Sequence, residues 1–486
     1  MKNKPKNLWK KKCGTEFHHH VTVSTTYSTN EVEDRIVYLE DLEKRKQIYG
    51  ICGECNEPGT GFYWCRPCNA KRFEDNFKNW TSGNKVVDEF IQHSQLNAIY
   101  FHKCLEWIPF EKFQKVTYVA EGGFGKVYSA EMPEGIIVYW DFENQKWYRV
   151  EYSKYALKSL KNSSDIGSDF LNEIKSHLQI HLNDIVKCYG ITQDPKTKEY
   201  MMVFYYYEDG NLRNYLNDSV FYVDYMSKIY SLRIISRGLL DIHNAGLVHK
   251  DFHSGNILYN DIYPCISDLG MCRPVNQQSI KEEGIYGVLP YVAPEVLRGH
   301  QYTKSADIYS FGIIMNELLS EEIPFKDISH DEFLAIRICQ GDRPKISKDV
   351  PQLLTDLIIK CWDAEIENRP TAKELYQMLE KWWEERYDED SELNFQINEC
   401  DKIGEKNFYN KSNEDKSKNI QSHSQAFYTS RLLNFKNLPK PVNSIDLSSL
   451  QFNSASNYTI QSTSANQNSV QINELELNEF WQNDIE

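Results

Sequence analysis

The stretch His249-Lys250-Asp251-Phe252-His253-Ser254-Gly255-Asn256 decides the fold of this chain. Asp251 is followed five positions later by Asn256, and 17 positions later by Asp268 in an Asp-Leu-Gly triplet. Two aspartates and an asparagine in this order could hold a hydroxyl and magnesium ions around an ATP phosphate. The stretch therefore indicates a phosphoryl-transfer centre. Asp251 would act as the base or hydroxyl-orienting group, and Asn256 and Asp268 would bind Mg²⁺.

A glycine-rich segment upstream fits the phosphates of a nucleotide. Gly122 and Gly125 follow a short extended run, and their missing side chains would let backbone N–H groups approach phosphate oxygens. One turn glycine of the G-x-G-x-x-G-x-V pattern is replaced by Ala120, which predicts a stiffer or slightly displaced loop. Val127, two positions after the last glycine, would cover the adenine.

A lysine and a glutamate complete the predicted nucleotide site. Residues 155–158 are expected to form a strand, and we assign Ala156 and Lys158 to the nucleotide, with Lys158 on its α- and β-phosphates. Glu173 lies 15 positions after Lys158 on an expected helix, and it is the predicted partner of that lysine. Taken alone, the two residues could also be a surface lysine at a strand end and an exposed helix glutamate.

Further motifs occur downstream in a fixed order. They are Ala-Pro-Glu at 293–295, Asp307 in Ser-Ala-Asp-Ile-Tyr-Ser-Phe-Gly, and Arg369 in Asn-Arg-Pro. With these motifs, residues 111–386 resemble the catalytic domain of eukaryotic protein kinases, and within that family the tyrosine kinase-like group. The resemblance implies that Glu295 pairs with Arg369 and that Asp307 anchors the catalytic loop.

The resemblance also implies a fold and a nucleotide pocket. The expected fold is α+β and bilobal, with a β-rich N-lobe, a helical C-lobe and ATP between them. Residues 203–207 would form the fifth strand and the hinge, with Phe204 as a bulky gatekeeper. Backbone groups of Tyr205 and Tyr207 would contact the adenine.

Further positions in and after the catalytic stretch depart from the family pattern. Lys250 replaces an arginine that can grip an activation-loop phosphate with two hydrogen bonds, so we expect weak control by loop phosphorylation, although Ser279 and Tyr286 are available acceptors. His253 stands where serine/threonine kinases carry lysine, and Val288 where they carry threonine. Protonated His253 could donate to the γ-phosphate, which predicts a pH-dependent rate.

These motifs predict an ATP- and Mg²⁺-dependent protein kinase that phosphorylates serine and threonine hydroxyls of protein substrates in intracellular signalling. Two alternatives stay open. The chain could have dual or tyrosine specificity, because markers of either preference are absent. It could also be a pseudokinase, a scaffold or protein-interaction module that binds nucleotide without efficient catalysis.

Four cysteines upstream form a pair of C-x-x-C knuckles, Cys52 with Cys55 and Cys65 with Cys68, nine residues apart. Four thiolates at this spacing suit a tetrahedral structural Zn²⁺. A redox C-x-x-C and a set of unligated thiols are the alternatives. Similar cysteine-containing leaders precede fungal kinases of the tyrosine kinase-like group, and we interpret this region as a protein-interaction or regulatory module.

The composition along the chain suggests four segments. Residues 1–30 are expected to be a disordered basic and polar tail, and residues 31–110 a helical region that contains the knuckle at 52–68. The kinase-like segment 111–386 carries an insertion at 131–154, predicted to be a hairpin that lengthens the second and third strands. Residues 387–486, rich in Asn, Ser and acidic residues, are expected to be a disordered tail. Either end could bind a regulatory partner.

Charge and hydropathy bound the location and the partners. The formal net charge of −15 over 486 residues argues against a general nucleic-acid or anionic-membrane binder, although a basic cluster at the start could be a nuclear address. Charged residues interrupt every apolar run before the roughly 18 residues that a membrane span needs. We expect a cytoplasmic protein, with the nucleus as the alternative, whose 12 cysteines are thiols or metal ligands.

Overall fold

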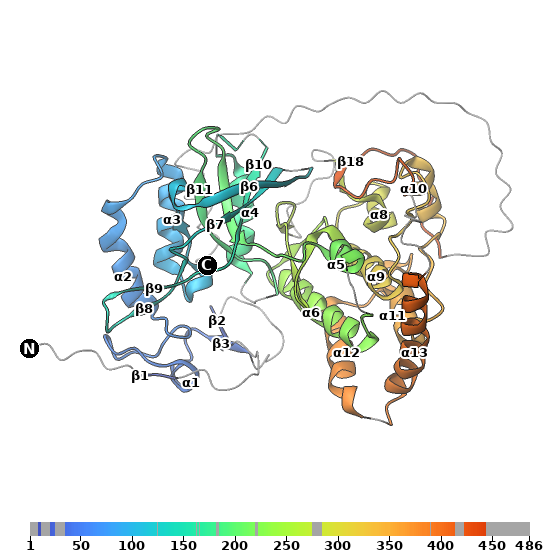
Figure 1. Cartoon of the computed structure of the whole chain (residues 1–486), viewed down its shortest axis with the longest axis horizontal. Helices are drawn as coiled ribbons and strands as arrows, with labels where there is room; N and C mark the ends of the chain where they lie inside the picture. The colour runs from blue at the N-terminus through green and yellow to red at the C-terminus, as the bar shows by residue number, and fades with distance from the viewer. Residues whose placement is uncertain are drawn as a thin grey trace, which may run out of the picture. The chain divides into compact units, whose positions relative to one another are not determined.

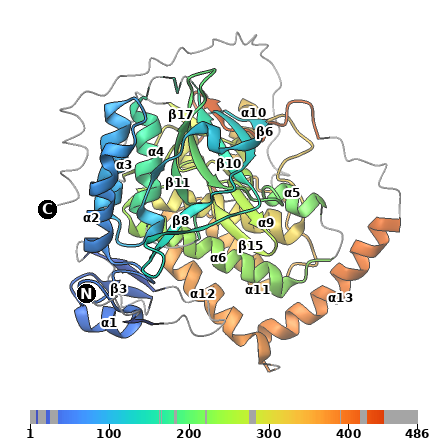
Figure 2. The same cartoon turned by 60° about the vertical axis from the view of Figure 1, so that its left-hand side comes forward.

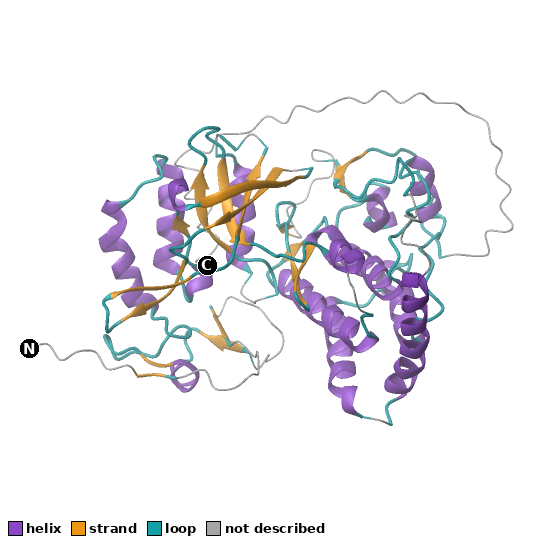
Figure 3. Cartoon of the chain, in the orientation of Figure 1, coloured by secondary structure: helices purple, strands orange, loops and turns teal. Residues whose placement is uncertain are grey.

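The computed structural model divides at Tyr206 and Tyr207 into two compact units, each described here by itself (Figure 1). The first unit combines a β-sheet with helices, and the second is mainly helical (Figure 3). This confirms the predicted α+β class. The described residues are 8–10, 20–24, 35–123, 125–161, 163–164, 166–180, 184–218, 222–274, 284–388, 390–413 and 422–443.

A six-stranded sheet forms the centre of the first unit. Its order is β5-β11-β12-β10-β7-β6, and all neighbours are antiparallel except the parallel pair β5 and β11. The side chains of β10 alternate between buried and half-buried, as expected for a strand with one face on a core. Helix α4 (Ser168–Gln179) contacts β11. The strands are β5 (Glu106–Trp107), β6 (Gln114–Glu121), β7 (Gly125–Glu131), β10 (Tyr155–Leu160), β11 (Cys188–Gln193) and β12 (Tyr200–Tyr205).

Before the sheet, the described residues form three α-helices together with short strands and 3-10 turns. Strand β1 pairs antiparallel with β4, and β2 pairs parallel with β3. In Figure 1, α2 and α3 lie side by side. The elements are β1 (Leu8–Trp9), β2 (Val21–Val23), β3 (Ile36–Tyr38), α1 (Leu42–Tyr49), β4 (Gly50–Ile51), α2 (Arg66–Asn76), η1 (Phe77–Asn79), α3 (Lys85–Asn97), η2 (Phe101–Lys103) and η3 (Phe110–Lys112).

Strands β1 and β2 correct the expectation that residues 1–30 are disordered throughout. Trp9 is buried and stacks on Phe142, with ring centroids 6.4 Å apart. Val21 and Val23 are buried in one cluster with Ile36. Both strands form because partners elsewhere in the chain bury these apolar side chains, and local composition carries no signal of such partners.

The insertion forms the predicted hairpin, from β8 (Ile136–Asp141) and β9 (Lys146–Val150). The prediction that it lengthens the second and third strands is wrong, because the hairpin is a separate two-stranded sheet. Its Trp147 stacks on Phe73, with ring centroids 4.7 Å apart, and on Trp64, at 5.8 Å. These aromatic contacts pack the hairpin against the cysteine-containing region. Glu106 of β5 also binds the hairpin, because it accepts the Ile137 N–H at 3.0 Å and pairs with Arg149.

The second unit is built around α6 and α9. Helix α9 is buried along almost its whole length, and α6 packs against α12. Helix α12 begins with a capping box between Thr371 and Glu374, which satisfies two backbone N–H groups at its start. Among the described residues, no helix combines the length and apolarity that crossing a membrane requires. The helices are α5 (Leu212–Asp218), α6 (Tyr225–Asn244), η4 (Ser254–Asn256), η5 (Leu289–Tyr291), α8 (Pro294–Leu297), α9 (Lys304–Ser320), α10 (Glu332–Cys339), α11 (Gln352–Cys361), η6 (Ile366–Asn368), α12 (Ala372–Glu384), η7 (Glu385–Tyr387) and α13 (Glu392–Asn413).

Three strand pairs complete the second unit, and all of them are antiparallel. The pair β14–β15 follows directly on the catalytic stretch, and the pair β17–β18 joins residues far apart in the sequence. The strands are β13 (Leu247–Val248) with β16 (Arg273–Pro274), β14 (Ile257–Asn260) with β15 (Tyr263–Ile266), and β17 (Ile285–Gly287) with β18 (Arg431–Leu433).

Helix α13 and strand β18 correct the expectation that residues 387–486 are disordered throughout. Figure 2 shows α13 as a long helix after α12. Leu393 and Ile397 on α13 are buried, and Asp401 accepts hydrogen bonds from the Tyr222 hydroxyl, at 2.8 Å, and the Tyr225 amide, at 3.0 Å. The few apolar residues of this polar segment are used at specific contacts, and such contacts offset the ordering entropy.

Candidate functional site

The predicted lysine and glutamate form an ion pair in the first unit. Strand β10 pairs Lys158 with Val127 on one side and with Met202 on the other. The Lys158 ammonium lies 2.7 Å from a carboxylate oxygen of Glu173 on α4. The Glu173 side chain is 1% exposed, so little water screens the pair. The structure thus confirms the pairing predicted from sequence spacing.

The glycine loop joins β6 to β7. The Gly122 N–H donates to the Gly125 carbonyl at 2.8 Å, which closes the turn. A Cβ on Gly125 would lie 1.8 Å from the carbonyl oxygen of Ser159, so only glycine fits against β10 there. A Cβ on Gly122 would meet nothing within 4 Å. Backbone approach to a phosphate is therefore open at Gly122, whereas Gly125 is fixed by its own strand neighbour.

The predicted gatekeeper and hinge residues lie at and beyond the end of β12. Ala156 pairs with Phe204 across β10 and β12. Phe204 is buried, and its ring centroid is 5.3 Å from that of His177 on α4. Tyr205 ends β12 in the first unit, and Tyr207 begins the second unit.

The catalytic stretch of the second unit is anchored by a buried carboxylate. Asp307 accepts the backbone N–H groups of His249, at 2.9 Å, and Lys250, at 3.1 Å. It also lies 2.9 Å from Nε2 of His243. Lys250 has a left-handed φ of 69°, which costs energy for a side chain with a Cβ. The Asp307 hydrogen bonds hold that backbone in place, as the resemblance implies.

The three predicted polar residues of the centre are positioned by backbone hydrogen bonds. Asn256 Nδ2 donates to the Asp251 carbonyl at 2.9 Å, and the Ser267 N–H donates to the Asn256 carbonyl at 2.8 Å. Ser267 precedes Asp268, whose φ of 58° is again left-handed. These bonds connect the loop that carries Asp251 to the segment that carries Asp268.

His249 supports the same segment. Its Nε2 lies 3.2 Å from the Ser267 carbonyl, so this nitrogen carries the proton. Burial lowers the pKa of His249, although the carboxylates of Asp307, Asp251 and Asp268 oppose that shift. The ring therefore stays neutral and acts as a hydrogen-bond donor beneath the loop.

His253 and Asp251 meet a residue that the sequence did not predict. The Gly255 N–H donates to His253 Nδ1 at 3.0 Å, which leaves Nε2 as the protonated nitrogen of the neutral ring. That nitrogen lies 3.2 Å from the hydroxyl of Ser430, and the same hydroxyl donates to Asp251 Oδ2 at 2.6 Å. A single serine in a serine-rich tail carries no sequence signal that could have identified it.

The other departures from the family pattern have visible consequences. Val288 is buried and offers no hydroxyl, and no group of the described residues forms a hydrogen bond with the buried Asp251 Oδ1. The Lys250 ammonium lies 5.2 Å from the ring centroid of Tyr302, whose hydroxyl donates to the Tyr286 carbonyl. The predicted acceptor Ser279 lies outside the described residues.

The Glu295–Arg369 pair is present as the resemblance implies. The guanidinium donates to both carboxylate oxygens, at 2.7 and 2.9 Å. Both residues are buried, and such a two-pronged pair is geometrically specific. It ties the start of α8 to the loop before α12.

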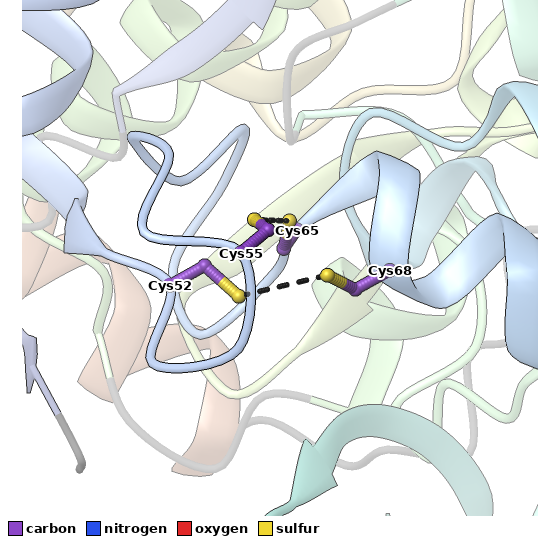
Figure 4. Close-up of side chains that lie close together, drawn as sticks. All are labelled: Cys52, Cys55, Cys65 and Cys68. Atoms are coloured by element: carbon purple, nitrogen blue, oxygen red, sulfur yellow. Dashed lines mark hydrogen bonds between the residues drawn. The ribbon is translucent and has the colours of Figure 1, made fainter. Parts of the chain in front are cut away.

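The four knuckle cysteines converge in the first unit (Figure 4). Their sulfur atoms all lie within 4.8 Å of one another, with Cys52 3.8 Å from Cys68 and Cys55 3.6 Å from Cys65. Four sulfurs about 2.3 Å from a tetrahedral Zn²⁺ would be about 3.8 Å apart. Contacts with the sulfurs of Cys65 and Cys68 lower the pKa of the Cys52 thiol, which favours a thiolate.

Two elements place these cysteines. Cys52 and Cys55 lie in the turn after β4, while Cys65 is the N-cap of α2 and Cys68 lies in its first turn. Trp64, directly before Cys65, is fully buried and donates from its indole to the Ala98 carbonyl at 2.7 Å. The cluster is thus assembled by the fold itself.

Comparison with known proteins agrees with this geometry. Residues 113–379, more than half of the chain, match the family model described as protein tyrosine and serine/threonine kinase. This range contains every residue assigned above to the nucleotide, the catalytic loop and its anchors. The cysteine cluster and the segment with Ser430 lie outside it.

Three named relatives are similar to this chain over half of its length or more. "Probable serine/threonine-protein kinase gdt4" of Dictyostelium discoideum is 30% identical over 283 residues, 56% of this chain and 16% of the relative. Serine/threonine-protein kinase TNNI3K of Rattus norvegicus is 27% identical over 356 residues, 72% of this chain and 39% of the relative. Serine/threonine/tyrosine-protein kinase HT1 of Arabidopsis thaliana is 26% identical over 247 residues, 50% of this chain and 63% of the relative. This chain therefore spans less than two thirds of each of these relatives.

Proposed function

Because the chain belongs to the protein tyrosine and serine/threonine kinase family, we propose that it transfers the γ-phosphate of ATP to serine and threonine hydroxyls of proteins. Members of this family use ATP and Mg²⁺. The observation that carries the proposal is the ion pair between Lys158 and buried Glu173, at 2.7 Å. Phosphoryl transfer requires the lysine to be held toward the nucleotide phosphates, and this pair holds it.

We assign the following roles. Asp251 orients the acceptor hydroxyl and takes its proton, and Asn256 and Asp268 hold Mg²⁺, which neutralises charge on the phosphates. The turn at Gly122 and the covering Val127 bind the nucleotide together with Lys158. Backbone hydrogen bonds support these roles, because they hold Asn256 and the segment before Asp268 in place, and β10 pairs Lys158 with Val127.

Peptide phosphorylation tests this function and its specificity together. The full chain, with Mg²⁺ and ATP, would be offered a degenerate peptide library and compared with Asp251→Ala. We expect incorporation mainly at serine and threonine, reduced at least a hundredfold in the variant, because loss of a proton-accepting group costs about 10²–10⁴ in rate. An exposed aspartate on α11 gives the matched control, Asp356→Ala, which should keep full activity.

Three results would contradict the proposal. Equal transfer by the wild type and Asp251→Ala would remove the catalytic assignment. Incorporation mainly at tyrosine would overturn the serine/threonine preference. A complete lack of transfer by the wild type would favour the pseudokinase alternative.

We also propose that the cysteine cluster binds one structural Zn²⁺. The sulfur separations of 3.6 and 3.8 Å support it, because they suit a tetrahedral ion. The full chain should purify with one equivalent of zinc, and a variant with serine at Cys52 and Cys65 should lose it. Cys400→Ser, on α13, is the control that should keep the metal. Substoichiometric zinc that does not change in the double variant would contradict the site and leave the redox or free-thiol readings.

Residues 31–110 are proposed to be a regulatory protein-interaction module, and the chain to be cytoplasmic, with the nucleus as the alternative. Lys103 of this module donates to the carbonyls of Leu178 and Ile180 at the end of α4. Through this contact a bound partner would act on Glu173, which lies on the same helix. The two C-x-x-C knuckles, interpreted as metal ligands, suit a reducing compartment. Imaging of the tagged chain would test the location, and a secreted protein would contradict it.

A further inference from the structure

Residues 422–443 belong to the second unit, and their strand β18 pairs with β17, which follows Asp268 in the sequence. Strand β18 pairs antiparallel with β17, with Leu433 opposite Ile285 and Arg431 opposite Gly287. Strand addition of this kind is a general way in which a sheet edge binds an extended peptide. The segment thus occupies the edge that an extended acceptor peptide could use.

Ser430, directly before β18, brings its hydroxyl to the catalytic aspartate. The hydroxyl donates to Asp251 Oδ2 at 2.6 Å and receives the Nε2 proton of His253 at 3.2 Å. A hydroxyl that accepts a phosphate must lie within hydrogen-bond distance of the group that takes its proton. Among the described residues 422–443, Ser430 alone has a hydroxyl bonded to Asp251.

Contacts before Ser430 fix the segment. The backbone N–H of His330 donates to the Gln425 carbonyl at 2.9 Å, and His330 Nδ1 lies 2.9 Å from the Phe427 carbonyl. The guanidinium of Arg213 lies 4.5 Å from the ring centroid of Tyr428. Such a cation–π contact helps to hold the segment in place.

Contacts after Ser430 fix the other side. Leu433 and Leu438 are buried, whereas Leu432, Asn434 and Asn437 beside them are exposed. The Val442 N–H then donates to the Cys339 carbonyl at 3.0 Å. Anchors on both sides of Ser430 set its register, because a slip of one residue would expose Leu433.

We propose that residues 422–443 are a substrate segment bound in cis, and that Ser430 is an autophosphorylation site. This inference rests on the proposed phosphoryl transfer. The Ser430 oxygen forms a bond to the γ-phosphorus of ATP, and the bond from that phosphorus to the β–γ bridging oxygen breaks. ADP leaves with the electron pair, and the hydroxyl proton passes to Asp251.

Phosphorylation changes how the segment fits. A phosphate on Ser430 brings about two negative charges close to the Asp251 carboxylate, so like-charge repulsion weakens the bound state. The unmodified segment excludes other peptides from Asp251. The phosphorylated segment dissociates from Asp251 and leaves it accessible to those peptides. The bound tail therefore acts as a competitor that the enzyme removes by its own reaction.

Mapping of phosphate on the full chain tests the site. Wild type with Mg²⁺ and ATP should acquire phosphate on Ser430 with a first-order rate constant that does not change with protein concentration. Ser430→Ala should lose this phosphate, while Thr429→Ala, one residue away and exposed, should keep it. Library peptides that are phosphorylated while Ser430 stays unmodified would overturn the site. A rate constant that rises in proportion to protein concentration would overturn transfer in cis.

Two neighbouring leucines test whether the segment competes with peptides. Leu433→Asp places a charge at a buried position, whereas Leu432→Asp changes a side chain that is 47% exposed. Before autophosphorylation, Leu433→Asp should lower the KM for a library serine peptide roughly three- to tenfold without raising kcat, since KM reports the unoccupied fraction. Leu432→Asp should behave as the wild type.

The outcomes are distinct from failure of the proposed function. Equal KM values for the wild type and both leucine variants would overturn occupancy of the acceptor site by the tail. Phosphate on Ser430 together with transfer to library peptides supports both claims. Transfer to neither Ser430 nor any peptide would remove the proposed kinase activity itself, and this inference with it.

Discussion

The ion pair of Lys158 and Glu173 shows how one buried charge positions another. Glu173 is almost fully buried, and its carboxylate holds the ammonium at 2.7 Å. Glu173→Gln keeps the shape and removes the charge, which leaves the ammonium with a weaker partner. Loss of one member of a buried pair costs about 3 kcal/mol. We therefore expect kcat/KM for a serine peptide to fall at least about tenfold.

The same substitution on an exposed pair is the control. Glu89 lies 3.6 Å from Lys85 on α3, and both side chains are largely in solvent. Glu89→Gln should change neither stability nor kcat/KM measurably, because exposed pairs contribute about 0–1 kcal/mol. Unchanged kinetics in Glu173→Gln would argue against a role for the pair in catalysis.

His253 is the residue at which donor chemistry and ring packing can be separated. Its Nε2 reaches Ser430, and its ring centroid lies 5.9 Å from that of Tyr291. His253→Phe keeps a ring and loses the N–H, while His253→Gln keeps a side-chain N–H donor. Loss of a donor next to charge costs about 1.5–3 kcal/mol, so His253→Phe should lower kcat/KM roughly 10- to 100-fold.

Steady-state kinetics with a serine peptide would measure this effect. His253→Gln should retain more activity than His253→Phe, because it preserves the donor. A phenylalanine variant with wild-type kinetics would show that His253 contributes only packing.

Single residues were predictable where a short motif fixes the chemistry. Lys158 with Glu173, Asp307 with the catalytic loop, and Glu295 with Arg369 were each found as expected. Ser430 was not predictable, because its partner Asp251 lies 179 positions away and tertiary packing alone brings them together.

At the scale of elements, α4 is held by the segment before the kinase-like region. Lys103, in η2, donates to the carbonyls of Leu178 and Ile180 at the end of α4, the latter at 2.7 Å. These N–H donors satisfy carbonyls that have no partner within the helix at its C-terminal end. Because α4 carries Glu173, this contact links the cysteine-containing region to the nucleotide site within the first unit.

Burial and the nearby charge of Lys187 lower the pKa of Lys103 well below its ordinary value. The folded protein therefore binds fewer protons than the unfolded chain between that lowered pKa and about 10.4. The contribution of Lys103 to the unfolding free energy therefore falls as the pH falls through this window, and it grows as the pH rises.

Lys103→Met tests this linkage. The unfolding free energy of the wild type, relative to the variant, should increase between pH 7 and 9 by up to about 1.4 kcal/mol per pH unit. Denaturant unfolding at several pH values would measure it, with the exposed Lys71→Met on α2 as the control. A difference that does not change with pH would contradict the lowered pKa.

Elements were predictable where local pattern decides them. The two β-rich runs at 136–150 gave the hairpin, since strand propensity and a polar turn are local properties. Its packing on Trp64 was not predictable, and neither were β1, β2, α13 and β18. Each of these depends on a buried partner distant in sequence, which overrides a polar local composition.

For the whole molecule, the two compact units and the α+β class follow from the kinase-like motifs. The cysteine cluster stood outside those motifs, yet its neighbour Trp64 lies in one aromatic cluster with Phe73 and Trp147. The cysteine cluster and the insertion of the kinase-like region are therefore parts of one packed structure within the first unit. Loss of the proposed zinc should therefore also lower the stability of the hairpin.

Metal removal tests that coupling. Chelation should lower the unfolding temperature of the wild type by several degrees, because structural zinc stabilises the fold that supplies its ligands. Trp147→Ala should itself cost up to about 3 kcal/mol, since it removes a partly buried ring that packs on Trp64 and Phe73, whereas the neighbouring Tyr148→Ala, 44% exposed, should cost less. If the tryptophan transmits the effect, chelation will shift the unfolding of Trp147→Ala less than that of the wild type or Tyr148→Ala, and the two losses will not add. Full additivity of chelation and Trp147→Ala would show that the cysteine cluster and the hairpin unfold independently.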